Sequence, residues 1–277
     1  MIQMPYFNCF IYKQCRTREK EKFSMKKVKY NFILLLGLFL TINLTSCSDD
    51  DGYNLNDFVL SLATVNPIDV EKGTYSLILD DGTTLWPTAS NVLYRPKYGQ
   101  RVLVSYTILS DQIGEYDHYI RVNNIYDILT KKVVDLTAEN EKEIGNDPIK
   151  LLSMWVGDDY LNIHFGVNVG GGQAKHAINL VQNKLSVDVQ NTSDNEITLE
   201  FRHNANGDPE NYGEKSFVAF DLRPFKKEGK DSVTFVIKVK DYDGEMKTYP
   251  ITYVFDGINT TKNINSTEIP DINLQIE

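Results

Sequence analysis

The chain has 277 residues, with 29 Lys and Arg against 38 Asp and Glu and a formal net charge of −9. Residues 1–46 hold eight of the basic and two of the acidic residues, so the chain from Cys47 onward has 21 against 36 and a net charge of −15. Such an acidic chain lacks the basic footprint that nucleic-acid phosphates require. Cys47 is the only cysteine in this part, which excludes internal disulfides and zinc–cysteine sites.

Residues 25–46 are predicted to be a lipoprotein signal peptide. Three lysines at positions 26, 27 and 29 precede the apolar run FILLLGLFL at 32–40, which is shorter than the about 20 residues that a membrane span needs. The following LTSC resembles a bacterial lipobox, in which the cysteine thiol receives a diacylglycerol and cleavage occurs just before it. Cys47 is therefore the expected lipidation site and membrane anchor. The alternative is a signal anchor with an unrelated cysteine.

The residues after Cys47 predict where in the cell envelope the protein is exported. Ser48, Asp49, Asp50 and Asp51 resemble the signal that exports lipoproteins of the Bacteroidetes to the outer face of the outer membrane. We therefore expect an outer-membrane, lipid-anchored protein exposed on the cell surface, with residues 47–56 as an acidic tether. The alternatives are a solvated acidic spacer and a periplasm-facing protein.

Residues 1–24 precede a complete signal peptide and have no apolar periodicity. We interpret them as an unstructured stretch upstream of a misassigned start, with translation beginning at Met25.

Residues 57–136 read as a small β-barrel. The segment TYSLILDDGTTLW at 74–86 predicts a hairpin with its turn at Asp80, Asp81 and Gly82. In RVLVSYTIL at 101–109, alternate apolar residues fall on one face, as a half-buried strand requires. The segment HYIRVNNIYDIL at 118–129 predicts another long strand with a bulge at Asn123 and Asn124.

Residues 137–148 have the polar composition of a linker, with room for one helical turn, and residues 149–256 predict a second domain of short strands. The segment LLSMWVGDDYLNIHFGVN at 151–168 predicts two strands around Gly157 and Asp158. In EKSFVAFDL at 214–222, Phe217 and Ala219 alternate with Val218 and Phe220. The clearest hairpin is SVTFVIKVKDYDGEMKTYPITYVF at 232–255. Strands of this spacing, without long amphipathic helices, predict an antiparallel, Ig-like β-sandwich, followed by a C-terminal tail or edge strand at 257–277.

The leader, the barrel strands, DDYLNIHFGVNVGGGQAKHAINLV and LEFRHNANGDPENYGEKSFVAFDLRPF together resemble the NigD-like lipoproteins of the Bacteroidetes. The resemblance spans nearly all of the chain after Cys47, and RHNANGDPE followed by FVAFDL is its most specific part. It implies an all-β protein with an N-terminal OB-like barrel and a C-terminal β-sandwich. It implies no catalytic residues, and the OB label does not imply nucleic-acid binding.

The loop RHNANGDPENYG at 202–213 is the main candidate for function. Its Asn, Gly, Asp and Pro residues are typical of a turn that joins two strands without any ligand. Binding residues nevertheless concentrate on loops held by rigid strands, and Arg202, His203, Asn204 and Asp208 supply donors and acceptors together. Ligand binding by these four residues is the alternative to a purely structural loop.

Other motifs give weaker signals. Ser232, in Asp-Ser-Val, resembles the O-glycosylation motif of exported Bacteroidetes proteins. DYDG at 241–244 has the alternating carboxylates of a calcium ligand set but not the remaining ligands of an EF-hand loop. GGG at 170–172 lacks the other elements of a phosphate loop. The histidines at 118, 164, 176 and 203 show no metal-binding spacing, so we expect no metal site and no cofactor.

No catalytic constellation stands out, so we expect that the chain is not an enzyme. A non-catalytic binding or interaction module at the outer membrane surface is favoured, with a glycan, a peptide or an envelope protein as its partner and no nucleic acid. Trp86, Tyr94, Tyr98 and Tyr106 are either core residues or an aromatic platform for such a partner. The alternative is an accessory of a bacteriocin, secretion or pilus system that acts by β-strand addition, for which INLQIE at 272–277 supplies an alternating terminal segment.

Overall fold

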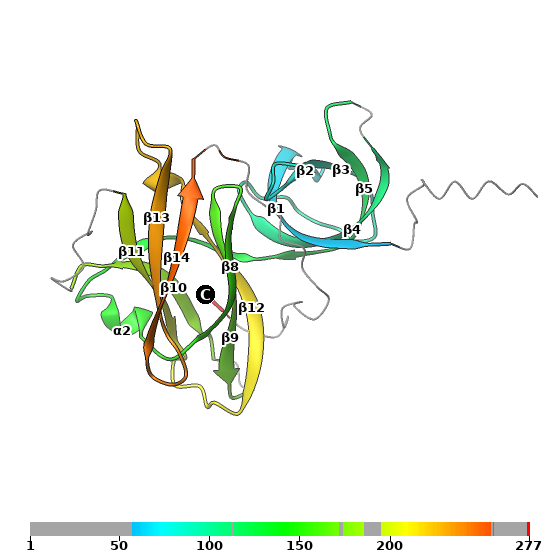
Figure 1. The fold of residues 1–277 in the computed structure, drawn as a ribbon. Coiled ribbons are helices and arrows are strands. Elements are labelled where there is room, and N and C mark those ends of the chain that lie inside the picture. The colour runs from blue at the N-terminus through cyan, green and yellow to red at the C-terminus, as the bar shows by residue number, and fades with distance from the viewer. Residues whose placement is uncertain (1–56, 112–113, 172–173, 186–194, 256, 258–275) are drawn as a thin grey trace, which may run out of the picture. The chain divides into compact units, whose positions relative to one another are not determined.

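A closed five-stranded barrel opens the described part of the chain, coloured from blue to green in Figure 1. The structure is a computed structural model that describes residues 57–111, 114–171, 174–185, 195–255, 257 and 276–277. The barrel strands follow one another in the order β1 (Val59–Asp69), β2 (Thr74–Leu79), β3 (Thr84–Ser90), β5 (His118–Asp127) and β4 (Arg101–Asp111). The predicted start, signal peptide and tether at 1–56 lie outside the described residues.

Alternating apolar side chains build the barrel core. Val102, Val104 and Tyr106 of β4 are buried in it, as the period of two along a half-buried strand requires. The predicted turn at Asp80 joins β2 to β3. The predicted bulge is also present, because the register of β4 against β5 skips Asn123. A parallel pairing of β3 with β5 completes the barrel.

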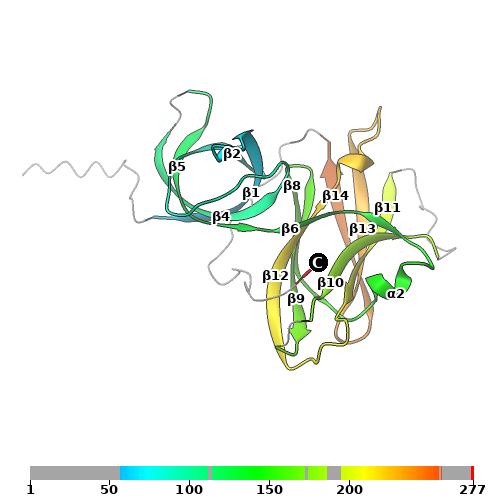
Figure 2. The same cartoon turned by 180° about the vertical axis from the view of Figure 1, so that it is seen from behind.

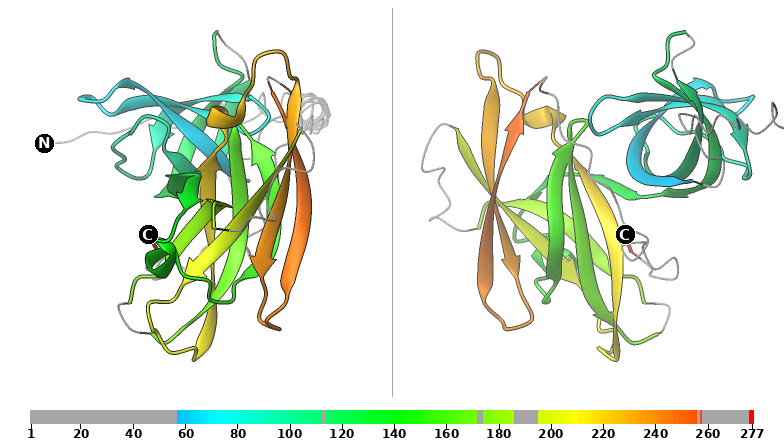
Figure 3. Two further views of the ribbon diagram at one scale, coloured as in Figure 1. Left: turned by 90° about the vertical axis from the view of Figure 1, so that its left-hand side faces the viewer. Right: turned by 45° about the vertical axis from the view of Figure 1, so that its right-hand side comes forward.

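Two sheets form the sandwich, and they face each other in Figure 3. The five-stranded sheet has the order β14 (Met246–Val254), β13 (Ser232–Lys240), β11 (Glu196–Asn204), β10 (Ala177–Asn183) and β7 (Val134–Leu136). The four-stranded sheet has the order β6 (Leu129–Lys132), β12 (Tyr212–Asp221), β9 (Tyr160–Val169) and β8 (Lys150–Gly157). Residues from both sheets share one large apolar cluster, which explains the alternation predicted for β13. The all-β architecture of a barrel followed by a sandwich is confirmed.

The structure differs from the sequence analysis between the two domains. Residues 129–136, which we assigned to the barrel, supply β6 and β7 to the two sheets of the sandwich. The predicted linker contains the short helix α2 (Glu141–Ile144), seen beside the sandwich strands in Figure 2. Ile144 of this helix is buried with Leu136 and Val181. The chain therefore enters the sandwich at Leu129, twenty residues before the predicted start at 149, because β6 and β7 are too short to show a period.

The sandwich is also not purely antiparallel. β11 pairs in parallel with β13, β10 with β7, and β12 with β6. These pairs join segments that are distant along the chain, whereas alternation within a strand only reports which face is buried. The alternation of apolar residues therefore could not predict whether two strands pair in parallel or antiparallel.

β12 packs on both of its faces. Val218 and Phe220 belong to the core between the sheets, whereas Phe217 and Ala219 belong to a second cluster. The second cluster also contains Leu62 and Leu103 from the outer side of barrel strands β1 and β4. A strand covered on both faces has a continuous apolar run, which is what EKSFVAFDL provides. The barrel and the sandwich lie in one compact unit, Tyr53–Glu277.

A buried ion pair reinforces this junction. Arg101 of β4 donates from Nη2 to Asp80 Oδ1 at 2.5 Å and to Asn162 Oδ1 of β9 at 3.0 Å. The second oxygen of Asp80 accepts a hydrogen bond from Trp155 Nε1 of β8 at 2.7 Å. Both charged side chains are almost completely buried, so each depends on the other for its compensation. Arg101 and Asp80 of the barrel are thereby hydrogen-bonded to Asn162 and Trp155 of the sandwich.

Candidate functional site

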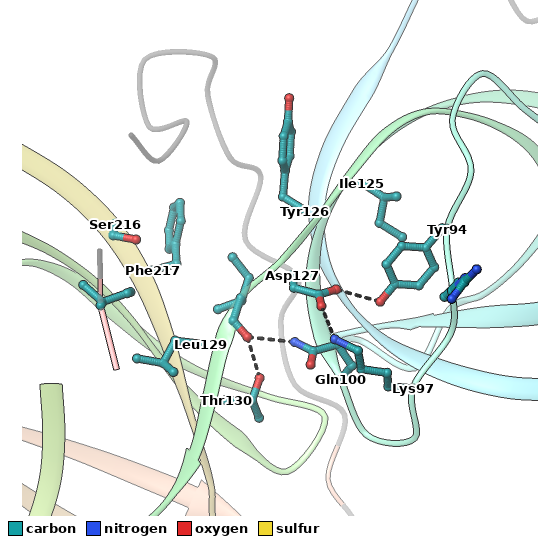
Figure 4. Close-up of a pocket in the computed structure, with 13 residues that line it drawn as sticks. Tyr94, Lys97, Gln100, Ile125, Tyr126, Asp127, Leu129, Thr130, Ser216 and Phe217 are labelled. Carbon is teal, nitrogen blue, oxygen red and sulfur yellow. Dashed lines mark hydrogen bonds and ion pairs between the residues drawn. The ribbon is translucent and has the colours of Figure 1, made fainter. Parts of the chain in front are cut away.

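A groove of about 750 Å³ runs along the segment that connects β5 to β6 (Figure 4). The barrel loop before β4 lines it with Tyr94, Arg95, Lys97 and Gln100. The end of β5, Ile128 and the start of β6 add residues 125–130, and Ser216 and Phe217 of β12 and Ile276 complete the lining. The site thus combines side chains from four separate stretches of sequence.

Asp127 is the polar centre of the groove. Tyr94 donates its hydroxyl to Asp127 Oδ1 at 2.8 Å, and Lys97 Nζ bonds the other oxygen at 2.8 Å, as Figure 4 shows. Burial, and then the hydrogen bond to Asp127, raise the pKa of the Tyr94 hydroxyl well above its ordinary value. Tyr94 therefore stays neutral and acts as a donor. Because both carboxylate oxygens already accept a hydrogen bond, Asp127 holds the loop against β5.

Gln100 and Thr130 fix the backbone below this cluster. Gln100 Nε2 donates to the carbonyl oxygens of Arg101 and Ile128, both at 2.8 Å. Thr130 Oγ1 donates to the same Ile128 carbonyl at 2.9 Å. These bonds satisfy the carbonyls of Arg101, in β4, and of Ile128, between β5 and β6, so the groove has a preformed floor.

The opposite side of the groove is apolar. Phe217 is buried and Leu129 and Ile276 are half-buried on this side, whereas Ile125 lies beside Tyr94 on the barrel side (Figure 4). The groove therefore presents an apolar wall beside a hydrogen-bonded polar wall, which suits recognition of a ligand that has both kinds of surface. Its one carboxylate is bonded to Tyr94 and Lys97, and the lining contains neither histidine nor cysteine.

The four residues predicted as a ligand loop lie at one end of the sandwich, away from the lining of this groove. Arg202 pairs with Glu200 Oε2 through two bonds, at 2.6 and 2.8 Å, and also donates to the Gly145 carbonyl. Asn204 donates to the carbonyls of Lys142 and Glu143 at the end of α2. Both side chains therefore brace α2 against β11.

His203 and Asp208 belong to a buried chain of hydrogen bonds that also contains His176. His203 Nδ1 bonds the Pro148 carbonyl at 3.0 Å, and its Nε2 lies 2.8 Å from His176 Nδ1. His176 Nε2 lies 3.2 Å from Asp208 Oδ2, which also accepts the Gly170 amide at 2.6 Å. The chain links three loops at this end of the sandwich.

The donor and acceptor roles in this series of hydrogen bonds follow from the groups at its two ends, the Pro148 carbonyl and Asp208. A carbonyl only accepts, so His203 Nδ1 donates to Pro148 and His203 Nε2 is left as an acceptor. Burial lowers the pKa of His203 to about 4, in agreement with a neutral ring. The Gly170 amide, and then His176, hold the pKa of Asp208 below its usual range, so Asp208 also accepts. His176 Nδ1 is thereby assigned as the donor to His203 Nε2.

The remaining sequence candidates are placed as follows. Asp241, in the predicted turn after β13, accepts hydrogen bonds from Lys247 and Lys150, and Lys247 is the main reason that the Asp241 pKa is strongly lowered. Gly170 lies close to Asp208 and Pro209, where a Cβ atom would come within 2.6 Å of Pro209 Cδ. Ser232 is the first residue of β13 and is half-buried. Among the described residues, no group of three or more His, Cys, Asp or Glu side chains is arranged to hold a metal ion.

The aromatic residues of the barrel have different environments. Tyr106 is buried in the core, Trp86 packs against Tyr116, and Tyr98 is 79% exposed outside the groove lining. Only Tyr94 of the four aromatic candidates lines the groove. Cys47, Ser48, Asp49, Asp50 and Asp51 lie outside the described residues, so lipidation and export stay predictions. In the part of the chain that the structure describes, no helix has the length and hydrophobicity to cross a membrane.

A closed OB-type barrel that leads into a two-sheet sandwich defines a two-domain, all-β class of protein. The NigD-like N-terminal OB domain matches residues 62–128, and the NigD-like C-terminal β-sandwich domain matches residues 132–253. The chain therefore belongs to the NigD-like family. The second match begins at Lys132, the last residue of β6, so it starts before the predicted sandwich boundary at 149.

Solved structures show the same architecture. A protein from Parabacteroides distasonis ATCC 8503, described only as related to a toxin, is 39% identical over 72% of this chain and 95% of its own, with a TM-score of 0.62. A protein of unknown function from Bacteroides vulgatus ATCC 8482 is 29% identical over 79% of this chain and 100% of its own, with a TM-score of 0.65. A NigD-like immunity protein from Bacteroides caccae ATCC 43185 shares the fold at 20% identity, over 74% and 100% of the two chains, with a TM-score of 0.56. No curated protein matches the chain.

Proposed function

We propose that this chain is a lipid-anchored protein of the cell envelope that binds a partner in the groove beside Asp127 and catalyses no reaction. The groove carries the proposal, because it offers an apolar wall and a fixed polar wall whose carboxylate is bonded to Tyr94 and Lys97. A preformed site of this kind binds without paying to order its own side chains. A surface glycan or an extended peptide has the mixed polar and apolar surface that fits it.

The predicted anchor supports an envelope location. Lipid on Cys47 would hold the protein to the outer membrane, and the acidic residues 48–51 would direct it to the cell surface. A groove displayed on a tether at that surface would meet glycans and proteins from outside the cell.

Groove binding is tested with variants of two tyrosines of the barrel domain. Tyr126 lines the groove and Tyr98 is exposed outside it, so Tyr98→Ala is the matched control for Tyr126→Ala. Wild type and both variants are screened on an oligosaccharide array and on a library of extended peptides, after their melting temperatures have been compared.

We expect Tyr126→Ala to weaken the binding of any hit by about tenfold or more, because aromatic side chains dominate such contacts, and Tyr98→Ala to leave it unchanged. The proposal fails if wild type binds neither library, or if the two variants bind a hit equally well.

A second candidate function is that of an accessory in a bacteriocin, secretion or pilus system that works by β-strand addition. It is favoured by one observation, the parallel bridge between Ile276 and His176 beside β10. The toxin-related description of the 39% identical relative is a further reason to keep it.

A further inference from the structure

The side chains of the groove have more hydrogen-bond donors to offer a ligand than acceptors. Both oxygens of Asp127 already accept a hydrogen bond, from Tyr94 and from Lys97. Gln100 uses both N–H groups of its Nε2 on backbone carbonyls. The Lys97 ammonium carries three N–H groups and gives one of them to Asp127, while its side chain is 65% exposed. A ligand in the groove therefore meets donors that need an acceptor.

Arg95 adds a cation to this lining. It lines the groove and is exposed, and the described residues give it neither a hydrogen bond nor an ion pair. All five N–H donors of its guanidinium are therefore available to a ligand. A guanidinium binds a carboxylate through two parallel hydrogen bonds, so the contact is both strong and directional. Arg95 is the lining residue best suited to hold an anionic group.

The groove is positive although the chain is acidic. Its lining contains two cations, Arg95 and Lys97, against the single carboxylate of Asp127. The chain from Cys47 onward has a net charge of −15. The groove is thus a local site for an anion on a surface that otherwise favours cations.

The positive charge continues along β6 beyond the groove. Lys132 is exposed and lies two residues after Thr130, a lining residue, so both side chains lie on the same face of the strand. The carboxylate that interacts with Lys132 is Asp221, which Arg223 already binds at 2.8 Å. A ligand that extends past the groove in this direction meets a second cation.

A glycan suits this lining better than an extended peptide. A peptide brings a backbone N–H donor with each carbonyl, and these donors find few free acceptors among the side chains of the groove. A sugar hydroxyl either donates or accepts, so it adapts to a lining rich in donors. Tyr126 and Phe217 add aromatic rings to the lining, as Figure 4 shows, and the apolar face of a sugar ring packs on such a ring.

We propose that the ligand of the groove is an acidic glycan, a chain of sugars that carry carboxylates. One carboxylate pairs with Arg95 and Lys97, the sugar ring packs on Tyr126, and a further carboxylate lies towards Lys132. The inference rests on the proposed function and narrows its ligand to one chemical class.

The test measures the affinity of the chain from Cys47 onward for matched pairs of sugars by isothermal titration calorimetry. The probes are short oligosaccharides of galacturonic, mannuronic and glucuronic acid, each beside its carboxyl-reduced form, which keeps the ring and the hydroxyls but loses the charge. We expect at least one acidic probe to bind at least about tenfold more tightly than its reduced form, because a hydrogen bond to a charged group is stronger than one between neutral groups.

Arg95→Gln is expected to remove this preference. It should weaken the binding of the acidic probe by about tenfold and leave the binding of the reduced probe unchanged. Lys238→Gln is the matched control, because it also removes one positive charge but from the outer face of β13, which contributes nothing to the groove lining. We expect the control to change neither affinity by more than about twofold. Melting temperatures of the three proteins are compared first.

Three results overturn the inference. Equal affinity for acidic and reduced probes does so but leaves the groove proposal standing if Tyr126→Ala weakens both. Binding of no acidic probe also does so, while neutral hits on the oligosaccharide array or the peptide library would still support the groove. Equal binding of the acidic probe by wild type and Arg95→Gln shows that the charge is recognised elsewhere. Tighter binding of an aspartate-rich peptide than of every acidic sugar contradicts the glycan class.

Discussion

At the scale of single residues, the junction between barrel and sandwich depends on a charge that has no contact with water. Arg101 is fully buried, and its guanidinium bonds Asp80, Asn162 and Thr64 while lying 5.2 Å from the centre of the Tyr160 ring. A buried pair of this kind contributes little net stability compared with apolar residues, but breaking it is costly because one charge is left without compensation. Its value here is to fix the relative position of β4 and β9.

Replacing Arg101 by Leu is therefore expected to lower the free energy of unfolding by about 3 to 5 kcal/mol, because Asp80 would stay buried without its partner. Arg223→Leu is the matched control. Arg223 also bonds an aspartate, Asp221, and lies 5.3 Å from the centre of the same Tyr160 ring, but its side chain is half exposed. The control is expected to cost about 1 kcal/mol or less. Urea denaturation at pH 7 measures the free energy of unfolding of both variants. An equal decrease in the two would contradict the role given to Arg101.

His203 gives the protein a defined pH dependence. Its pKa is about 4 in the folded state, below the ordinary value of 6.5, mainly because the ring is buried. Between these two values the unfolded chain binds a proton that the folded chain does not, so the free energy of unfolding falls as the pH falls from 6.5 towards 4. The full effect is about 3 kcal/mol at most.

His203→Asn is expected to flatten this part of the pH profile, because the asparagine cannot titrate but can still donate to the Pro148 carbonyl. The variant is expected to be less stable than wild type at pH 7 and closer to it at pH 4.5. Urea denaturation at several pH values from 7 to 4.5 compares the two slopes. Parallel slopes would show that another group titrates in this window.

At the scale of elements, the end of β8 packs closely against the turn after β2. A Cβ atom on Gly157, the last residue of β8, would lie 2.1 Å from Asp80 Cγ. No side chain fits there unless Asp80 moves away from Arg101 and Trp155. The glycine is thus required by the approach of the barrel turn to the sandwich strand.

Gly157→Ala is expected to destabilise the protein by about 1 to 3 kcal/mol through overpacking, and to disturb the environment of the Trp155 indole. Gly213→Ala in β12 is the matched control, because the nearest atom to its Cβ, Asn168 Oδ1, is 3.7 Å away. Thermal unfolding and tryptophan fluorescence measure the two effects. A control as unstable as Gly157→Ala would contradict the packing explanation.

Several elements were predictable from sequence because their signal is local. The hairpin of β13 and β14 and the bulge at Asn123 follow from alternation and turn residues. The run in β12 was predicted as a strand, but that both of its faces are covered is known only from the structure. By contrast, β6 and β7 have only four and three residues, so their place in the sandwich depends on distant strands and left no periodic pattern.

At the scale of the whole molecule, the groove is an assembly that no single segment encodes. Tyr94 was recognisable as an aromatic candidate, whereas Asp127 and Phe217 were predicted only as strand residues. They come together because β5 continues directly into β6, which brings the barrel loop, β12 and Ile276 around one segment. The loop RHNANGDPE had the stronger local signal, and its side chains brace loops and α2 in the structure. Turn chemistry explains that signal without a ligand.

The central claim is that a lipid anchor on Cys47 displays this binding module on the outer surface of the cell. The most direct measurement is protease treatment of intact cells that express wild type or the variant with Asp49, Asp50 and Asp51 all changed to Ala, after acyl labelling has confirmed lipid on Cys47. A periplasmic marker and lysed cells serve as controls. The account predicts that wild type is degraded on intact cells and that the variant is protected until the cells are lysed. Protection of wild type on intact cells, with degradation after lysis, would contradict surface display and leave a protein that faces the periplasm.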